Sequence, residues 1–502
     1  MGEVELKLQV PAAALPALER VLKSAPSKLT RLQATYFDTP ERALAQAEVA
    51  LRLRKEGRRW VQTLKAGAAH GIERAEHNVP VALAAGLQPA LDAQRHAGTP
   101  AGEALAAALK QATPRWIAVY TTDIRRRHRL QRTRLGVVEL ALDRGEIRGT
   151  GPDGIERRWP VCELEVELVS GSPLAVLDVA RRLAAKHGLW LDARTKAERG
   201  ERLAQGRVPV PAARAAAVEL RKAMSPHEAW QAVLRQVLAH ALPNWSEVAA
   251  DDGASAPQAD HVHQLRVALR RLRSAERLFA AWPGIDEPRW RDGVAALFRQ
   301  LGEVRDRDVL AGGLQRQIDA ALVEAGQAPA VPSEAAPGGI EPAGLHAHGL
   351  ALIDLLADAH APLLPAEGGE PAALPQRMAE RLDAWHAQIR RAARRFDRLD
   401  DADRHRLRKR LKRLRYAIEF GESLFAAKAV ERYLKPMRVA QERLGEFNDV
   451  CVAQAAYQQR AAAGEAQAWF ALGWLAQRRG QVLRDAGKAL RALRKAEPFW
   501  PR

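Results

Sequence analysis

The residues best suited to chemistry begin at the third position of the chain, where charged and apolar side chains alternate. Glu3, Glu5 and Lys7 are separated by Val4 and Leu6. Successive side chains of a β-strand point to opposite faces, so this spacing places the three charged groups on one face. Carboxylates arranged in this way suit a hard divalent cation such as Mg²⁺, and a lysine beside them can orient an anionic group or a water molecule.

The same alternation recurs through the first 205 residues, with acids and bases segregated between segments. Bases share one face in residues 49–54, 60–65 and 123–127, and acids share one face in residues 139–143 and 162–168. For any single strand, a sheet with a solvated charged face is the simplest interpretation. Glutamates on one face repel one another unless a cation neutralises them, so the whole set favours a closed barrel with its charges inside. Basic strands would then bind phosphate oxygens, and acidic strands would hold metal.

The order of these motifs resembles the CYTH family, the triphosphate tunnel metalloenzymes. The family's hallmark, Glu-x-Glu-x-Lys at the N-terminus, matches Glu3, Glu5 and Lys7. The later motifs follow in order as Tyr36-Phe37-Asp38-Thr39, Leu51-Arg52-Leu53-Arg54, Thr63-Leu64-Lys65, Arg125-Arg126-Arg127, Glu163-x-Glu165-x-Glu167 and Thr195-Lys196-Ala197-Glu198-Arg199-Gly200. The last motif usually begins with Ser in the family, and Thr195 keeps the hydroxyl group.

This resemblance implies an eight-stranded antiparallel β-tunnel with flanking helices, in which a triphosphate is hydrolysed with the help of metal. It implies that the triphosphate is bound by Arg52, Arg54, Lys65, Arg125, Arg127, Lys196 and Arg199. It implies that one or two Mg²⁺ or Mn²⁺ ions are held by Glu3, Glu5, Asp143, Glu163, Glu165 and Glu167. Glu3, Glu5 and Lys7 are the expected catalytic set, and the sequence leaves open whether Lys7 orients phosphate or water.

A second chemical pattern is a basic stripe that occurs twice in the other half of the chain. Residues 263–273 and 405–415 align without gaps as His-x-Leu-Arg-x-x-Leu-[Arg/Lys]-Arg-Leu-Arg. The match continues downstream at 301–309 and 444–450, at nearly the same separation from each histidine. Shared order and spacing indicate an internal duplication.

On a helix, the histidine and three of the bases in each copy fall on one stripe, beside a stripe of leucines that would pack in a bundle. The basic stripes are His263, Arg266, Arg270 and Arg273 in the first copy and His405, Arg408, Lys412 and Arg415 in the second. A solvated basic face is the ordinary interpretation of one such helix, yet like charges at this spacing destabilise it slightly. Recurrence in both copies favours two helices that line one shared anion-binding site.

This half resembles the CHAD domain, the conserved-histidine α-helical domain, over roughly residues 221–495, with His263 and His405 as the namesake histidines. The resemblance implies an all-α domain of two duplicated four-helix bundles around a basic channel that binds inorganic polyphosphate. The fold class is therefore α+β, with the tunnel in residues 1–205, a proline-containing linker in 206–220 and the helical domain in 221–497. The Pro/Gly-rich stretch at about 325–376 is expected to be a variable insertion.

Composition agrees with these assignments and limits the alternatives. A chain of 502 residues with 47% hydrophobic and 27% charged residues predicts several globular domains, and a net charge of +18 predicts an anionic partner. Two distant cysteines, Cys162 and Cys451, fit a reducing compartment, and neither a secretory signal nor a membrane-length apolar run is visible. We expect a cytoplasmic monomer or weak homodimer with no membrane partner, and polyphosphate granules are a candidate location.

Other functions fit parts of the pattern. An adenylate cyclase, or a hydrolase of thiamine or nucleoside triphosphates, would use the same tunnel but needs a pocket for the organic group, and no aromatic cluster in residues 1–205 demands one. A non-catalytic polyphosphate-granule binder is disfavoured because both acidic sets are intact. Specific nucleic-acid binding is not expected, because aromatic residues are not interleaved with the bases.

Overall fold

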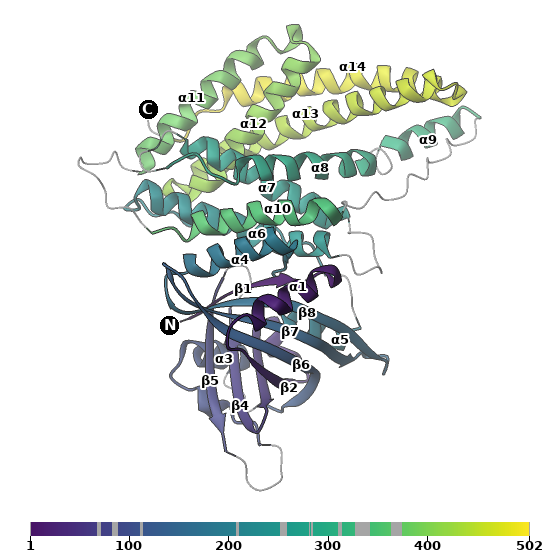
Figure 1. Ribbon diagram of the computed structural model, residues 1–502. Helices are drawn as coiled ribbons and strands as arrows, with labels where there is room; N and C mark the ends of the chain where they lie inside the picture. The colour runs from purple at the N-terminus through teal and green to yellow at the C-terminus, as the bar shows by residue number, and fades with distance from the viewer. Residues whose placement is uncertain are drawn as a thin grey trace.

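The computed structural model describes residues 2–67, 72–82, 89–110, 114–206, 210–250, 259–280, 282, 285–309, 314–326, 342–362 and 374–500. Within these ranges, a β-barrel is followed by a stack of helices (Figure 1). The predicted combination of an antiparallel tunnel and an all-helical region is confirmed. No helix in the same ranges is long and apolar enough to cross a membrane.

Eight antiparallel strands of the described chain close into the barrel, and a short ninth strand extends the sheet beside β1. They are β1 (Glu3–Gln9), β2 (Lys28–Asp38), β3 (Val49–Glu56), β4 (Arg59–Ala66), β5 (Glu73–Val81), β6 (Ile117–Arg132), β7 (Gly136–Thr150), β8 (Glu156–Gly171) and β9 (Trp190–Leu191). The order is β5-β4-β3-β2-β6-β7-β8-β1, and β1 closes the ring by pairing with β5. Closure satisfies the backbone groups that an open sheet would leave at its edges.

The period-two pattern decides which side chains face the barrel interior. On β1, Val4, Leu6 and Leu8 are buried on the outer face in a core shared with α4 (Leu174–His187). Smaller helices lie elsewhere around the barrel: α1 (Leu15–Lys23), α2 (Ala43–Gln46) and α3 (Pro100–Leu109). The charged residues of β1 therefore point inward, as the alternation predicts.

Helix α5 (Lys196–Ala204) packs across β6, β7 and β8. It begins at a capping box in which the Thr195 hydroxyl accepts from the Glu198 backbone N–H and the Glu198 carboxylate accepts from the Thr195 N–H. The threonine that replaces the usual serine thus performs the capping role. This start places Lys196 in the first turn, directed at the barrel.

The helices after residue 225 pack as two sets of four in the same chain order. The first set is α6 (Pro226–Ala249), α7 (Ala259–Phe279), α8 (Arg291–Val309) and α10 (Pro342–Ala359); the second is α11 (Leu374–Arg394), α12 (Asp401–Gly421), α13 (Ala427–Ala462) and α14 (Ala466–Lys495). Helix α9 (Gln315–Glu324) lies against α14. The duplicated motifs lie on α7 and α12, the second helix of each set, so the repeat in sequence is a repeat in structure.

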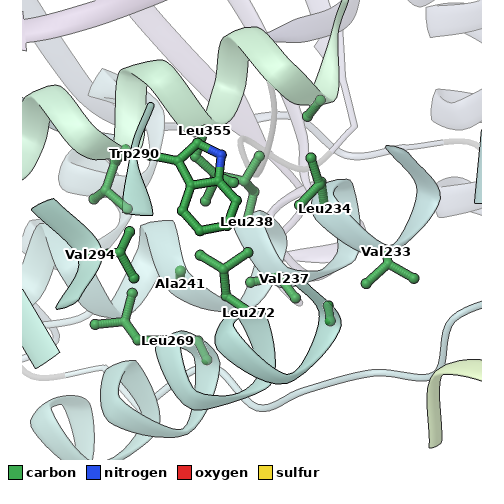
Figure 2. Close-up of a cluster of buried hydrophobic side chains, with 14 of the residues drawn as sticks. Val233, Leu234, Val237, Leu238, Ala241, Leu269, Leu272, Trp290, Val294 and Leu355 are labelled. Carbon is green, nitrogen blue, oxygen red and sulfur yellow. The ribbon is translucent and has the colours of Figure 1, made fainter. Parts of the chain in front are cut away.

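The leucine stripes of both motifs are buried, as predicted, because they pack against apolar side chains of neighbouring helices. The first bundle illustrates this packing. Figure 2 shows its core, which is built from apolar side chains of all four helices. Helix α6 contributes Val233, Leu234, Val237, Leu238 and Ala241, and the other helices contribute Leu269 and Leu272 of α7, Val294 of α8 and Leu355 of α10, together with Trp290 just before α8. The barrel and this bundle share one hydrophobic core, because α10 packs on both α4 and α6 (Figure 1). The two domains therefore form one continuous packed unit through this face.

The stretch of about 325–376, expected to be a variable insertion, contains α10, which completes the first bundle and contacts the barrel domain. The proline and glycine residues on which that expectation depended lie mostly at 327–341 and 363–373, outside the described residues. The helix between them is apolar enough to be buried on two sides.

Candidate functional site

A cavity of about 620 Å³ lies within the barrel, and side chains from all eight barrel strands line it. Basic groups on these strands and on α5 are Lys7, Arg52, Arg54, Lys65, Arg74, Arg126, Lys196 and Arg202. Acidic groups on the strands are Glu3, Glu5, Asp38, Glu76, Glu139, Asp143, Glu165 and Glu167. The cavity therefore offers cations for a polyanion and carboxylates for a metal within one enclosed volume.

Asp143, Glu163 and Glu165 form a buried acidic triad whose carboxylate oxygens lie within 4.8 Å of one another. The strand register explains the cluster, because Asp143 on β7 is directly opposite Glu163 on β8 and Glu165 is on the same face. The Lys196 ammonium lies 2.7 Å from Asp143 and 2.8 Å from Glu165, and it also contacts Glu163. Arg126 Nη2 lies 2.7 Å from Asp143 Oδ2.

The triad fits a hard divalent ion. Carboxylate oxygens are the donors that Mg²⁺ and Mn²⁺ prefer, and buried carboxylates this close together require positive charge. Lys196 and Arg126 supply that charge in this structure. Burial disfavours the charged form of Lys196, but Asp143, Glu163 and Glu165 outweigh it and raise the pKa of Lys196 above its ordinary value. The ammonium group stands in for the cation that the triad can hold.

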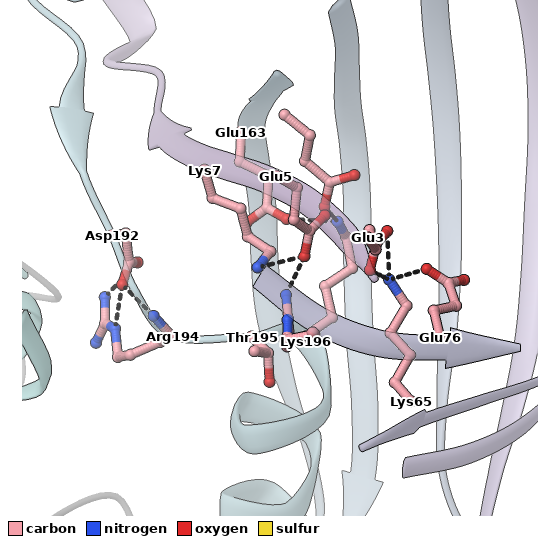
Figure 3. A network of polar contacts seen from close by, with 12 residues as sticks. Glu3, Glu5, Lys7, Lys65, Glu76, Glu163, Asp192, Arg194, Thr195 and Lys196 are labelled. Atoms are coloured by element: carbon pink, nitrogen blue, oxygen red, sulfur yellow. Dashed lines mark hydrogen bonds and ion pairs between the residues drawn. The ribbon is translucent and has the colours of Figure 1, made fainter. Parts of the chain in front are cut away.

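Glu3, Lys65 and Glu76 form a second cluster, shown in Figure 3. Lys65 Nζ lies 2.8 Å from Glu3 Oε1 and 3.0 Å from Glu76 Oε2. Burial raises the pKa of Glu3 to about 8, although Lys65 opposes the shift. Burial acts in the same direction on Glu76, but Lys65 and a hydrogen bond from Glu3 hold its pKa at about 2. Of the two carboxyl groups, Glu3 therefore holds a proton more readily than Glu76.

A third charged group consists of Glu5, Lys7 and Arg74. Lys7 Nζ lies 3.0 Å from Glu5 Oε1, and Arg74 pairs with the same oxygen. Burial opposes ionisation of Glu5, but Lys7 and Lys65 outweigh it and lower its pKa. Glu167 is directly opposite Glu5 on β8, where burial raises its pKa to about 7. The six predicted metal ligands therefore do not form one site. Asp143, Glu163 and Glu165 form a common cluster, whereas Glu3, Glu5 and Glu167 lie outside it.

The predicted phosphate-binding arginines of β3 both face the cavity. Arg52 donates to the Tyr36 hydroxyl at 2.9 Å, and Arg54 Nε donates to Glu56 at 2.7 Å. Burial opposes the charged form of Arg52, yet Tyr36 and Glu76 raise its pKa above the ordinary value. Burial and the neighbouring Arg52 lower the pKa of Arg54. Because an arginine side chain keeps its charge in proteins, both guanidinium groups can still bind phosphate oxygens inside the barrel.

In the helical half, the two basic stripes meet where α7 packs on α12. Arg270 of α7 and Arg408 and Arg415 of α12 surround Lys412 closely enough to add to the effect of burial, and together they lower the Lys412 pKa to about 6. Arg266, Arg270 and Arg273 also gather around the Phe298 ring, with guanidinium carbons 5.0, 5.7 and 5.1 Å from its centroid. His405 Nδ1 lies 2.8 Å from Asn448 Oδ1, which orients its ring.

Comparison with known proteins identifies both parts of the chain. The model of the CYTH domain matches residues 1–200, and the model of the CHAD domain matches residues 229–458. The chain joins a CYTH domain to a CHAD domain. His263 and His405 lie within the matched CHAD range, and most of the residues that line the cavity described above lie within the matched CYTH range.

Individual relatives cover parts of this arrangement. An inorganic triphosphatase of Haemophilus influenzae is 26% identical over 210 residues, which are 40% of this chain and 54% of the relative, so the chain spans about half the length of the curated relative it matches. The solved CHAD domain of Ricinus communis is 31% identical, with a TM-score of 0.45 over 57% of this chain and 98% of that one. A solved Hippeastrum protein, described as having a dominant triphosphatase activity, is 19% identical, with a TM-score of 0.27 over 41% of this chain and 97% of that one.

Three predicted substrate ligands of the CYTH domain are placed differently from expectation. Arg126 lines the cavity together with Thr122 and Ile124, so Arg125 and Arg127 lie on the opposite face of β6. In a run of three consecutive arginines, the sequence does not show which side chains face the barrel interior. The register of β6 with β7 decides this. Arg199 is buried against Glu163 rather than among the cavity-lining residues.

Arg74 and Glu76 on β5 are among the charged residues of the cavity that were not predicted from the sequence. They alternate with Ala75 and His77 in the same period-two manner as the other strands, and Asn78 continues the face. That alternation indicates a strand with one polar face. It is weaker than the others because β5 carries one base, one acid and one amide on its inner face instead of charges of one sign.

Proposed function

We propose that the CYTH domain hydrolyses inorganic triphosphate in a metal-dependent reaction, releasing pyrophosphate and phosphate. The observation that carries this proposal is the cavity that Arg52, Arg54 and Lys65 line together with Asp143 and Glu165 of the acidic triad. A linear triphosphate carries negative charge along its whole length, so it matches cations distributed around a barrel. Phosphoryl transfer depends chiefly on positioning and charge neutralisation, which such a cavity provides.

The residues would divide the work by position. Mg²⁺ or Mn²⁺ held by the triad would supply Lewis-acid polarisation of phosphoryl oxygens. Arg52, Arg54 and Arg126 would bind the phosphate oxygens, and their burial excludes water that would screen them. Lys7, paired with Glu5, would orient the terminal phosphate or the attacking water.

A substrate panel tests this proposal directly. Purified protein is incubated with tripolyphosphate, ATP, thiamine triphosphate or long polyphosphate, with Mg²⁺ or Mn²⁺, and phosphate and cyclic AMP are measured. We expect fastest release from tripolyphosphate. Faster turnover of an organic triphosphate, or formation of cyclic AMP, would replace the inorganic substrate, and no turnover with any substrate would leave a binding protein.

The variant Glu165→Gln should lower phosphate release by roughly a hundredfold or more, because it removes one carboxylate of the triad. Glu146→Gln is the matched control, since Glu146 is also a glutamate of the barrel sheet but pairs outside the cavity with Arg148. Full activity of Glu165→Gln would refute the assignment of the triad. Equal losses in both variants would point to damage of the barrel rather than of the site.

For the CHAD domain, we propose binding of inorganic polyphosphate along the paired stripes. The supporting observation is the crowding of Lys412 by Arg270, Arg408 and Arg415, which disfavours its charged form and which an anionic chain would relieve. The double variant Arg270→Ala with Lys412→Ala should weaken polyphosphate binding while tripolyphosphate turnover is retained. Arg406→Ala is the control, because that side chain lies on α12, is 57% exposed and pairs with Asp403. Equal loss of binding and turnover would mean that the two sites are not separate.

A further inference from the structure

The CYTH cavity is not enclosed by the barrel domain alone. Pro243 and Glu247 of α6 and His261 of α7 also line it, and all three belong to the helical domain. His261 Nε2 lies 2.9 Å from the Val210 carbonyl oxygen, so the segment that connects the domains is held at the same place. The helical domain therefore supplies part of the wall of the cavity.

Three consecutive residues of α6 contact the segment of the barrel domain that leads into α5. Trp245 Nε1 donates to the Leu191 carbonyl oxygen at 2.8 Å, and the Ala193 N–H donates to the Ser246 hydroxyl at 2.8 Å. Both Trp245 and Ser246 are fully buried. These bonds hold the chain just before the Thr195 cap, so they determine where α5 begins.

Glu247, the third residue, contacts α5 itself. Its carboxylate lies 2.8 Å from Arg202 in the last turn of α5 and 3.9 Å from Arg194, which precedes the helix. The Glu247 and Arg202 side chains are only 15% and 10% exposed. An ion pair shielded to this degree is screened less than a surface pair, and loss of one partner leaves the other charge buried without compensation.

The position of α5 matters because this nine-residue helix carries Lys196 and Arg199. Lys196 contacts all three carboxylates of the triad, and Arg199 contacts Glu163 from behind. A helix this short has little stability of its own, so tertiary contacts at both ends set its position. Capping by Thr195 holds its first turn, and Glu247 holds its last.

We propose that Glu247 of the helical domain is a positioning residue for the CYTH site, acting through Arg202 to keep α5 and Lys196 in register with the acidic triad. The inference rests on the proposed triphosphatase function for its kinetic consequence, but its structural consequence is independent of it. The helical domain is then a working part of the tunnel as well as a binding module. Its first bundle would contribute to triphosphate binding through the position of α5.

The test compares Glu247→Gln with Glu276→Gln in the full chain. Glu276 is the matched control, because it is 13% exposed and pairs with Arg291 inside the helical domain, away from α5. In Glu247→Gln, we expect amide hydrogen exchange within residues 196–204 to accelerate by roughly tenfold, while exchange in α13 stays unchanged. The KM for tripolyphosphate should rise by roughly fivefold or more, with a smaller change in kcat, because a mispositioned Lys196 weakens binding first.

Two further variants keep the proposal falsifiable. Glu247→Asp retains the charge at a shorter reach and should show a smaller effect, and the exchanged pair Glu247→Arg with Arg202→Glu should restore slow exchange in α5. Unchanged exchange in α5 of Glu247→Gln would overturn the proposal, as would acceleration spread equally over the whole chain. If the wild-type protein releases no phosphate from any substrate, the proposed function fails, whereas the exchange measurement still decides the role of Glu247.

Discussion

Replacing Lys412 with Arg should remove most of the pH dependence of polyphosphate binding. Burial and the neighbouring Arg270, Arg408 and Arg415 lower the pKa of Lys412 to about 6, while Asp449 opposes the shift. At pH 7.5, roughly one free molecule in thirty would carry the proton on Lys412. A bound polyphosphate chain supplies negative charge, returns the pKa toward its ordinary range and so takes up a proton on binding.

The direction and size of the pH effect on polyphosphate affinity follow from this proton uptake. A group that binds its proton more tightly in the complex makes the affinity fall as pH rises above the pKa of the free protein. Between pH 6.5 and 7.5, the affinity of the wild-type protein for polyphosphate should fall roughly eightfold. Arginine keeps its charge throughout this range, so Lys412→Arg should bind almost equally well at both pH values.

Isothermal titration calorimetry measures this directly. Titrations with long-chain polyphosphate, in buffers of different ionisation enthalpy at pH 7.5, should give about one proton taken up per binding event for the wild type and roughly none for Lys412→Arg. Long chains are used because only their terminal phosphates titrate in this range. Lys409→Arg, an exposed position on the same helix, should behave as the wild type. An equal pH slope in Lys412→Arg and the wild type would refute the reasoning.

Two other predictions concern the CYTH domain. Arg126→Met should lower tripolyphosphate turnover by roughly a hundredfold or more in steady-state assays, because Arg126 faces the cavity. Arg125→Met should change turnover less than about twofold, because Arg125 lies on the opposite face of β6. Equal effects of the two substitutions would contradict the register of β6. Gly200→Ala should destabilise the protein by about 1–3 kcal/mol, since a Cβ atom there would overlap the Tyr120 ring. Gly473→Ala meets no atom within 4 Å and should stabilise α14 by about 0.5–1 kcal/mol in thermal unfolding, so a loss of stability there would contradict the packing.

Periodicity along the chain determined most of the fold class. Alternation of charged and apolar residues at Glu3, Glu5 and Lys7, and again at Arg52 and Arg54, is a local property of a strand that reports its two faces. The repeat of His263 at His405 is likewise visible in one dimension. These patterns predicted a charge-lined barrel and a duplicated helical domain, and the family assignment agrees with them.

Local patterns failed where a residue's role depends on a distant partner. The inner arginine of Arg125–Arg127 depends on strand register, and the burial of Arg199 depends on Glu163, which is far away in the chain. The proline and glycine residues of about 325–376 gave no indication that this stretch contains α10, whose apolar residues pack on partners in both domains. Sequence spacing contains no information about such partners.

The sequence by itself determined which residue types are available to bind phosphate and metal, because composition and period are properties of the chain alone. Only the tertiary structure decided that Asp143 joins Glu163 and Glu165, because the register of β7 with β8 sets that approach. It also decided that Glu3 pairs with Glu76, because barrel closure brings β1 beside β5. It also decided that Glu247, far along the chain in the helical domain, reaches Arg202. Electrostatic energy depends on distance in space and on burial, and neither quantity is written in the order of the residues.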